Sequence, residues 1–311
     1  MDEYKEIVEY YKSTLIFKLS QIGHALNCDL LFSDRLELLP LYKCFELIKY
    51  LKDGNKVFID YGVLKNNIQN FYAIINNIKL LNIKLIFYIQ FEPYLPSEVF
   101  DVLLPISYCI YAQNNNYSHP NVHYIPIGIR DCGNTIKPQH ENFYHSYLLN
   151  EGLKNINKEH LCLIGGMGDT HPDRKICYNY LKDLSFVYDI SKFNYSVNIT
   201  SHYGKIPIHK YYDFIHRSIY IVSPRGCGVD CHRFFEAIYL RSIPIVKKTN
   251  TVFDKAYNIF PCLVINDWSD ITLDLLKSNL PDLQRKMNDF HIKYPNCFTN
   301  PSVLDQLLLE T

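Results

Sequence analysis

Residues 223–248 read SPRGCGVDCHRFFEAIYLRSIPIVKK, and this stretch decides the fold. The apolar run Ile219–Val222 just before it predicts a strand, and Asp230–Leu240 predicts a helix with apolar side chains at i, i+3 and i+4. Ile243–Val246 predicts another strand. A strand, a glycine turn, a helix and a further strand make the repeating unit of a parallel sheet flanked by helices.

The turn after Val222 combines several features of an anion-binding site. Gly226 and Gly228 permit tight backbone geometry and a close approach of a ligand. Asp230 is a suitable N-cap for the helix that follows, and the free amides at a helix start can bind a phosphate. Arg225 adds a positively charged side chain beside them. The turn therefore predicts a phosphate site.

The helix after this turn adds further polar side chains. His232 and Glu236 lie four residues apart on a face other than the apolar one, so we expect both to point into a ligand cleft. A carboxylate there can accept hydrogen bonds from both hydroxyls of a ribose, and Arg233 adds positive charge nearby. Together these residues indicate a nucleotide site. The alternative is an ordinary loop followed by a helix with a solvated charged face.

The alternation of strands and helices continues through both halves of the chain. In the first half, a helix is predicted over Asn67–Leu81 and strands at Lys56–Tyr61, Ile83–Ile89, Tyr108–Ala112 and His123–Ile127. In the second half, helices are predicted over Pro172–Leu184 and Leu273–Phe290 and strands at His160–Ile164, Phe186–Ile190 and Cys262–Ile265. Residues 131–159 are polar, as expected for a linker. We predict two Rossmann-like, doubly wound α/β domains, residues 1–150 and 151–311, that face a central cleft.

A second glycine turn lies in Leu163–Arg174, LIGGMGDTHPDR. Gly165 and Gly166 follow a predicted strand and precede a helix, which again creates a place where an anion can bind. Arg174 is expected on the first or second turn of that helix. The motif matches neither GxxxxGK[ST] nor GxGxxG, so it does not predict a dinucleotide site. The alternative is a plain connecting turn.

Residues 223–248 resemble the carboxyl-terminal domain of exostosin-type glycosyltransferases, a family with the GT-B fold. A Ser-Pro-Arg-Gly-like turn, an Arg, a Glu-Ala pair and an Ile-Pro-Ile/Val strand occur in the same order. The neighbouring stretches YYDFIHRSIYIV and TVFDKAYNIFPCLVINDWSDIT are also similar, so that the resemblance extends over residues 160–275.

The resemblance implies a nucleotide-sugar donor held by the C-terminal domain. By position, Glu236 would bind the ribose, and Arg225, His232 and Arg233 would lie near the diphosphate or the sugar. Arg174 is similar to a basic residue of GT-B donor domains that contacts the diphosphate. The N-terminal domain would hold the acceptor, which is expected to be a glycan or a glycoconjugate.

Two carboxylates of the first half are candidates for a catalytic base. Inverting sugar transfer needs a base that removes the proton of the acceptor hydroxyl. Glu92 follows the buried strand Ile83–Ile89, and GT-B fucosyltransferases have a Glu at a similar place. Asp60, at the end of the strand that begins at Lys56, is the rival. The alternative for either residue is a helix cap or a surface acid.

Composition and charge exclude several other classes of protein. The chain has 32 basic and 32 acidic residues, and a net charge of zero offers no basic excess for nucleic acid. No run of about 18 apolar residues predicts a membrane span. The N-terminus opens with acids and does not resemble a signal peptide, so we expect a cytoplasmic protein with reduced thiols. This fits a microbial or viral enzyme better than an anchored Golgi enzyme.

We expect neither a metal nor a cofactor at the predicted site. Cys227, Cys231 and His232 form CxxxCH, one residue longer than haem attachment requires, and no second pair has zinc-like spacing. The chain also lacks the Asp-x-Asp motif that binds a metal diphosphate. The sequence thus predicts a glycosyltransferase that is inverting and metal-independent. An epimerase of GT-B shape and a non-catalytic nucleotide-sugar-binding module are the alternatives, whereas an oxidoreductase should show GxGxxG.

Overall fold

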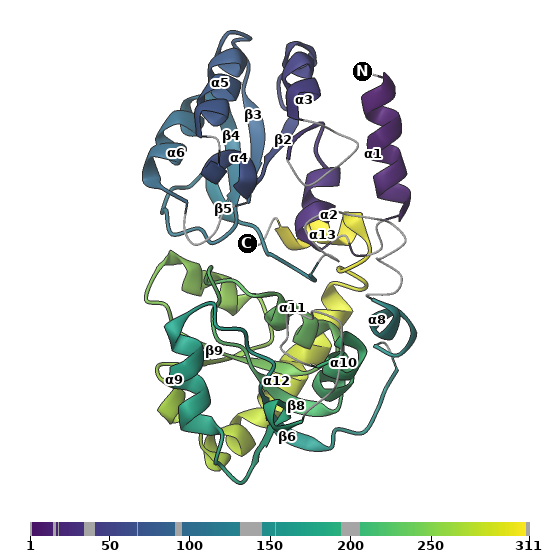
Figure 1. Cartoon of the computed structure of the whole chain (residues 1–311), viewed down its shortest axis with the longest axis vertical. Helices are drawn as coiled ribbons and strands as arrows, with labels where there is room; N and C mark the ends of the chain where they lie inside the picture. The colour runs from purple at the N-terminus through teal and green to yellow at the C-terminus, as the bar shows by residue number, and fades with distance from the viewer. Residues whose placement is uncertain are drawn as a thin grey trace. The chain divides into compact units, whose positions relative to one another are not determined.

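Two five-stranded parallel sheets form the framework of the protein in a computed structural model (Figure 1). The structure describes residues 2–14, 17, 19–33, 41–66, 68–90, 95–130, 145–152, 154–193 and 206–308. Strand order is β1-β2-β3-β4-β5 in the first sheet and β10-β9-β8-β6-β7 in the second, and neighbouring strands are parallel throughout. The predicted mixed α/β architecture with two parallel sheets is confirmed.

The first sheet is built from short apolar runs. Its strands are β1 (Leu30–Phe32), β2 (Lys56–Ile59), β3 (Leu85–Ile89), β4 (Ser107–Ala112) and β5 (Val122–Tyr124). Its helices are α1 (Asp2–Thr14), α2 (Gln21–Leu26), α3 (Leu41–Leu47), α4 (Tyr61–Asn66), α5 (Ile68–Lys79) and α6 (Ser97–Leu103). The apolar side chains that predict α5 as a helix are the ones it buries, namely Phe71, Ile74, Ile75 and Ile78.

The second sheet carries the stretch that decides the fold. Its strands are β6 (His160–Ile164), β7 (Val187–Asp189), β8 (Ser218–Val222), β9 (Ile243–Lys247) and β10 (Leu263–Ile265). Its helices are α8 (Ser146–Asn150), α9 (Pro172–Leu181), α10 (Ile208–His216), α11 (His232–Tyr239) and α12 (Leu273–Lys293), with 3-10 turns at Ile190–Lys192, Val252–Asn258 and Trp268–Asp270. Helix α10 contacts β8, and α11 and α12 contact β9, so these central strands are buried and read as continuous apolar runs.

The chain divides into two compact units. The first unit contains residues 1–141, 251–253 and 296–311, and the second contains 142–250 and 254–295. The second unit begins at residue 142, whereas the predicted C-terminal domain begins at 151, and the last helix, α13 (Pro301–Leu308), belongs to the first unit. The backbone N–H of Leu19 donates to the carbonyl of Phe298, 3.1 Å away, and Phe298 and Leu307 are buried.

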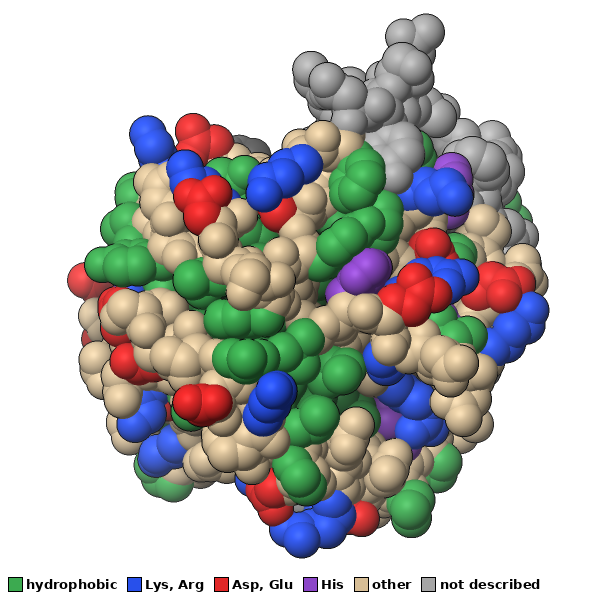
Figure 2. All heavy atoms as spheres, turned by 90° about the horizontal axis from the view of Figure 1, so that it is seen from below, with side chains coloured by type: hydrophobic (Ala, Val, Ile, Leu, Met, Phe, Trp, Pro, Cys, Tyr) green, Lys and Arg blue, Asp and Glu red, His purple; other side chains and the backbone are tan. Residues whose placement is uncertain are grey.

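The described surface is consistent with the balanced charge of the sequence. Figure 2 shows basic and acidic side chains interspersed over one face of the molecule. Among the described helices, none is long and apolar enough to cross a membrane.

Candidate functional site

The order of strands in the second sheet reverses between β6 and β8. The chain leaves β6 towards β7 on one side and leaves β8 towards β9 on the other, although β6 and β8 are neighbours. In open α/β sheets such a reversal opens a crevice beyond the carboxyl ends of the two strands, where ligands bind. Two loops border this crevice, residues 165–171 after β6 and residues 223–231 after β8. In the first sheet, the strands that the structure describes follow one another in chain order.

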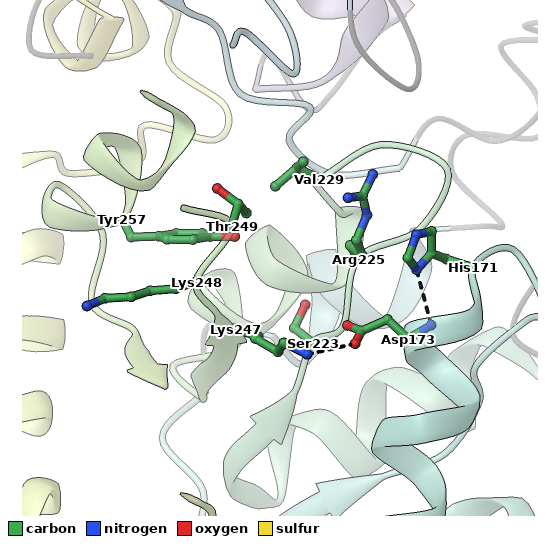
Figure 3. A pocket seen from close by; sticks show the side chains of 9 residues that line it. All are labelled: His171, Asp173, Ser223, Arg225, Val229, Lys247, Lys248, Thr249 and Tyr257. Carbon is green, nitrogen blue, oxygen red and sulfur yellow. Dashed lines mark hydrogen bonds and ion pairs between the residues drawn. The ribbon is translucent and has the colours of Figure 1, made fainter. Parts of the chain in front are cut away.

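A hollow of about 180 Å³ lies at this reversal, and we call it the switch-point pocket. Its lining comes from the connections after β6, β8 and β9 (Figure 3). The lining residues are His171, Asp173, Ser223, Arg225, Val229, Lys247, Lys248, Thr249 and Tyr257. Whole small-molecule sites have volumes of roughly 300–1,000 Å³, so this pocket matches one part of a ligand.

Ser223 places an unsatisfied hydroxyl group at the pocket. The residue is only 4% exposed, and its Oγ makes no hydrogen bond with any described residue. In Figure 3 this hydroxyl points into the hollow, while the backbone N–H of Ser223 donates to the carbonyl of Ile245. A buried hydroxyl without a partner costs about 1–3 kcal/mol. An oxygen atom of a ligand would remove this cost.

Asp173 and Lys247 form an ion pair at the base of the pocket. The Lys247 Nζ lies 3.2 Å from Asp173 Oδ1 and 3.6 Å from Asp267 Oδ2. Asp173 Oδ1 also accepts a hydrogen bond of 3.0 Å from the indole Nε1 of Trp268. Burial lowers the pKa of Lys247, but the hydrogen bonds and charges of both carboxylates outweigh burial and raise it. Lys247 therefore stays positively charged. Asp173 already accepts hydrogen bonds from Lys247 and Trp268.

Arg174 and Arg233, both predicted to lie near a diphosphate, hold the two loops together. The Arg174 Nε donates to the carbonyl of Arg225 at 2.8 Å, and its Nη1 donates to the carbonyl of Gly168 at 3.3 Å. Arg233 is buried, and its Nη2 and Nη1 donate to the carbonyls of Gly166 (2.7 Å) and Val222 (3.3 Å). Neither residue lines the switch-point pocket. Both arginines fix the positions of the loops around it.

The predicted glycines serve the packing of these loops. Gly165 and Gly166 have φ angles of +107° and +59°, a region that side chains rarely adopt. A Cβ on Gly226 would lie 2.9 Å from Arg174 Nη2, so a side chain there would displace the guanidinium. Gly228 accepts a hydrogen bond of 3.0 Å from the N–H of Gly226, which closes the turn.

The prediction that Glu236 lies on an open face of α11 is wrong. Every residue from Arg233 to Tyr239 is buried, and Glu236 is fully so. Its Oε1 accepts a hydrogen bond of 3.3 Å from the hydroxyl of Tyr212. His232 is partly exposed at the start of the helix. Neither residue is among the lining residues of the switch-point pocket.

In the first unit, Asp60 caps a helix. Its side chain is fully buried, its Oδ2 accepts a hydrogen bond from Ser33 Oγ, and its Oδ1 accepts one from the N–H of Val63 at 3.1 Å. This is the cap that the sequence offered as the alternative to a catalytic base. Glu92 lies outside the described residues.

Several lining residues were not predicted from the sequence. Lys247, Lys248 and Thr249 directly follow an apolar run, and this position was the signal, because residues after a parallel strand lie at the ligand edge of the sheet. Asp173 and Tyr257 gave no comparable signal. Among the described residues, no group of His, Cys, Asp and Glu side chains could hold a metal ion.

Comparisons with known proteins give only remote similarities. No family model matches this sequence, and no curated protein matches it significantly. A solved E. coli trehalose-6-phosphate structure bound with UDP-2-fluoro glucose is 11% identical, with coverage of 90% of this chain and 78% of that chain and a TM-score of 0.40. A trehalose-6-phosphate synthase studied for glycosyl transfer with retention is 11% identical (86% and 79% covered, TM-score 0.43). The α,α-trehalose 6-phosphate synthase of Burkholderia multivorans is 8% identical (86% and 72% covered, TM-score 0.41).

These TM-scores are too low to decide what the chain does. The geometry of its own second sheet is therefore the evidence for a functional site.

Proposed function

We propose that the protein is a glycosyltransferase of the GT-B type, which moves a sugar from a nucleotide-sugar donor to a hydroxyl of a glycan or another acceptor. The observation that carries this proposal is the chemistry of the switch-point pocket. Its lining offers the buried hydroxyl of Ser223, the guanidinium of Arg225 and the ammonium of Lys247. Asp173, the one carboxylate among the described lining residues, already accepts two hydrogen bonds. Such a lining suits phosphate oxygens, which accept hydrogen bonds and carry negative charge.

The diphosphate of the donor is the group that we assign to this pocket. A volume of about 180 Å³ holds only part of a nucleotide sugar, and the ring of Tyr257 forms one wall, against which an adjoining group could pack. The positive side chains would neutralise the charge that develops on the departing diphosphate. Since the chain also lacks Asp-x-Asp, we propose that transfer needs no metal. Activity should survive EDTA, and loss of activity that manganese or magnesium restores would contradict this.

The first test is binding. Thermal unfolding is measured with uridine, guanosine and adenosine diphosphates and with their sugars, because a ligand at 100 times its Kd stabilises a protein by about 2.7 kcal/mol. We expect one nucleoside diphosphate to stabilise the wild-type protein. If none does, the pocket is not a nucleotide site.

The second test separates three functions. The nucleotide sugar that binds is incubated with and without a panel of glycan acceptors, and its products are analysed. Release of nucleoside diphosphate that depends on an acceptor would establish a transferase. An altered sugar nucleotide without an acceptor would instead indicate an epimerase, and binding without turnover would indicate a binding module.

A further inference from the structure

His171 begins helix α9 in an unusual way. It is the N-cap residue, with extended backbone, and its ring Nδ1 accepts a hydrogen bond of 3.1 Å from the N–H of Asp173. Pro172, between them, has no N–H, so the amide of Asp173 is the first one that needs an acceptor. Since Nδ1 must keep its lone pair for this bond, a neutral His171 ring carries its proton on Nε2. The helix cap therefore fixes the tautomer.

The same ring borders two hollows. It lines the switch-point pocket and also a neighbouring hollow of about 510 Å³, which is lined by Asp169, Thr170, His171, Pro172, Lys175, Ile176 and Asn179. Figure 3 shows the His171 ring beside the side chain of Arg225. Burial, followed by the charge of Arg225, lowers the pKa of His171, so the ring is neutral at pH 7. A neutral N–H donor thus stands next to a cation at the edge of the pocket.

A capping role alone does not explain a histidine here. Asn, Asp, Ser and Thr are the preferred N-caps, and all are smaller. A second, independent feature of the pocket points to a ligand, namely the buried Ser223 hydroxyl, which has no partner among the described residues. His171 and Ser223 would then supply two uncharged donors to one ligand, alongside the charge of Arg225.

We propose that His171 is a ligand-binding residue of the donor site, whose Nε2–H donates a hydrogen bond to a diphosphate oxygen while Nδ1 caps α9. This inference rests on the proposed function, since it assumes that the pocket binds a nucleoside diphosphate. It adds a residue with two separable tasks, one for each ring nitrogen.

Two substitutions separate these tasks. His171→Asn keeps an acceptor near the position of Nδ1 and loses the Nε2 donor, whereas His171→Gln places an amide N–H near Nε2 and loses the cap. Both are made in the full chain. The Kd of the nucleoside diphosphate that binds the wild type best, and that of inorganic pyrophosphate, are measured by titration calorimetry. The Tm is measured by circular dichroism. His209→Asn, on α10 and outside the pocket lining, is the matched control.

We expect His171→Asn to raise the Kd about tenfold, as for the loss of one hydrogen bond, with little change in Tm. His171→Gln should lose less affinity but have the lower Tm, and His209→Asn should change neither. A His171→Asn protein that binds as tightly as the wild type would overturn the inference. If the wild type itself binds no nucleoside diphosphate, the proposed function fails, and this inference fails with it.

Discussion

Arg174 donates a hydrogen bond from its Nε to the backbone carbonyl of Arg225, 2.8 Å away, and so ties helix α9 to the loop after β8. Its Nη1 also reaches the carbonyl of Gly168 in the loop after β6. The tie depends on Gly226, because any side chain there would meet the guanidinium at 2.9 Å. Arg174 and Arg225 are 51 residues apart in the sequence. Their hydrogen bond thus holds the two glycine turns together as one binding surface.

The first prediction concerns the hydrogen bond between Arg174 and the carbonyl of Arg225. Arg174→Ala should leave the protein folded but raise the Kd for the nucleoside diphosphate about tenfold, because the loop that carries Arg225 loses its anchor. Titration calorimetry measures the Kd, and circular dichroism checks the fold. Arg285→Ala is the control, since Arg285 is exposed on α12 and pairs only locally with Asp282. Unchanged affinity in folded Arg174→Ala would show that the loop does not need this contact.

The second prediction concerns the hydroxyl of Ser223, which has no hydrogen-bond partner among the described residues. Ser223→Ala should weaken diphosphate binding while leaving the ligand-free protein equally stable or about 1 kcal/mol more stable, because a buried polar group without a partner is removed. Urea unfolding and titration calorimetry measure the two effects. Ser218→Ala, at the start of strand β8, which Ser223 directly follows, is the matched control, because the Ser218 Oγ donates to the carbonyl of Phe214 at 2.7 Å.

Ser218→Ala should therefore destabilise the protein without a large effect on binding. A loss of stability in Ser223→Ala, with unchanged affinity, would mean that this hydroxyl serves the fold and not a ligand.

Much of this fold could be predicted from sequence, because apolar runs such as β3 and β8 are local signals of buried strands. The burial of Glu236 could not, since a helix pattern shows which residues share a face but not whether a loop covers that face. The position of Lys247 after an apolar run indicates the ligand edge of the sheet, but its place beside the loop after β8 could not be predicted. It depends on strand order, which brings the end of β9 beside the end of β8. The position of α13 in the first unit likewise depends on tertiary contacts.

The third prediction follows from the burial of Glu236. Glu236→Ala should lower the free energy of unfolding by about 1–3 kcal/mol, because the Tyr212 hydroxyl loses its buried acceptor. Tyr212→Phe, which removes the donor instead, should also destabilise the protein. Urea unfolding followed by the fluorescence of Trp268, the single tryptophan of the chain, measures both. If the Glu236→Ala protein had normal stability but no longer bound the donor, Glu236 would be assigned to the donor ribose after all.

The fourth prediction concerns the stability of the protein at acidic pH. His24 in the first unit is buried and His291 in the second is partly buried, and burial lowers the pKa of each to about 4. Because the unfolded value is about 6.5, the unfolded chain binds these protons first as the pH falls. Stability should therefore be full above about pH 6.5 and decrease towards pH 4, with His24 accounting for about 3 kcal/mol.

Urea unfolding between pH 4 and pH 7.5 tests this. His24→Gln keeps an amide donor for the carbonyl of Pro126, which the His24 Nε2 contacts at 2.8 Å, but does not titrate. This variant should show a flatter decline of stability with acid. Equal profiles for the variant and the wild type would exclude His24 as a source of the decline.

The last prediction concerns the catalytic base of the proposed sugar transfer. Asp60 is fully buried and accepts hydrogen bonds from Ser33 and from the backbone of Val63, which makes it a poor group to receive the proton of an acceptor. Glu92 lies outside the described residues, but it follows β3 in sequence. We therefore expect Glu92→Gln to lower turnover by about 10²–10⁴ with donor binding nearly unchanged.

Asp60→Ala should instead lower the stability of the protein by about 1–2 kcal/mol, as for the loss of an N-cap. Initial rates, calorimetric donor binding and urea unfolding are measured on both variants, with Asp60→Asn as the variant that can still cap α4. Near-normal turnover in Glu92→Gln, together with lost turnover in stable Asp60→Asn, would identify Asp60 as the base. The anomeric proton of the product, observed by NMR, tests the mechanism itself. A single displacement inverts the donor configuration, so a product with retained configuration would exclude it for either carboxylate.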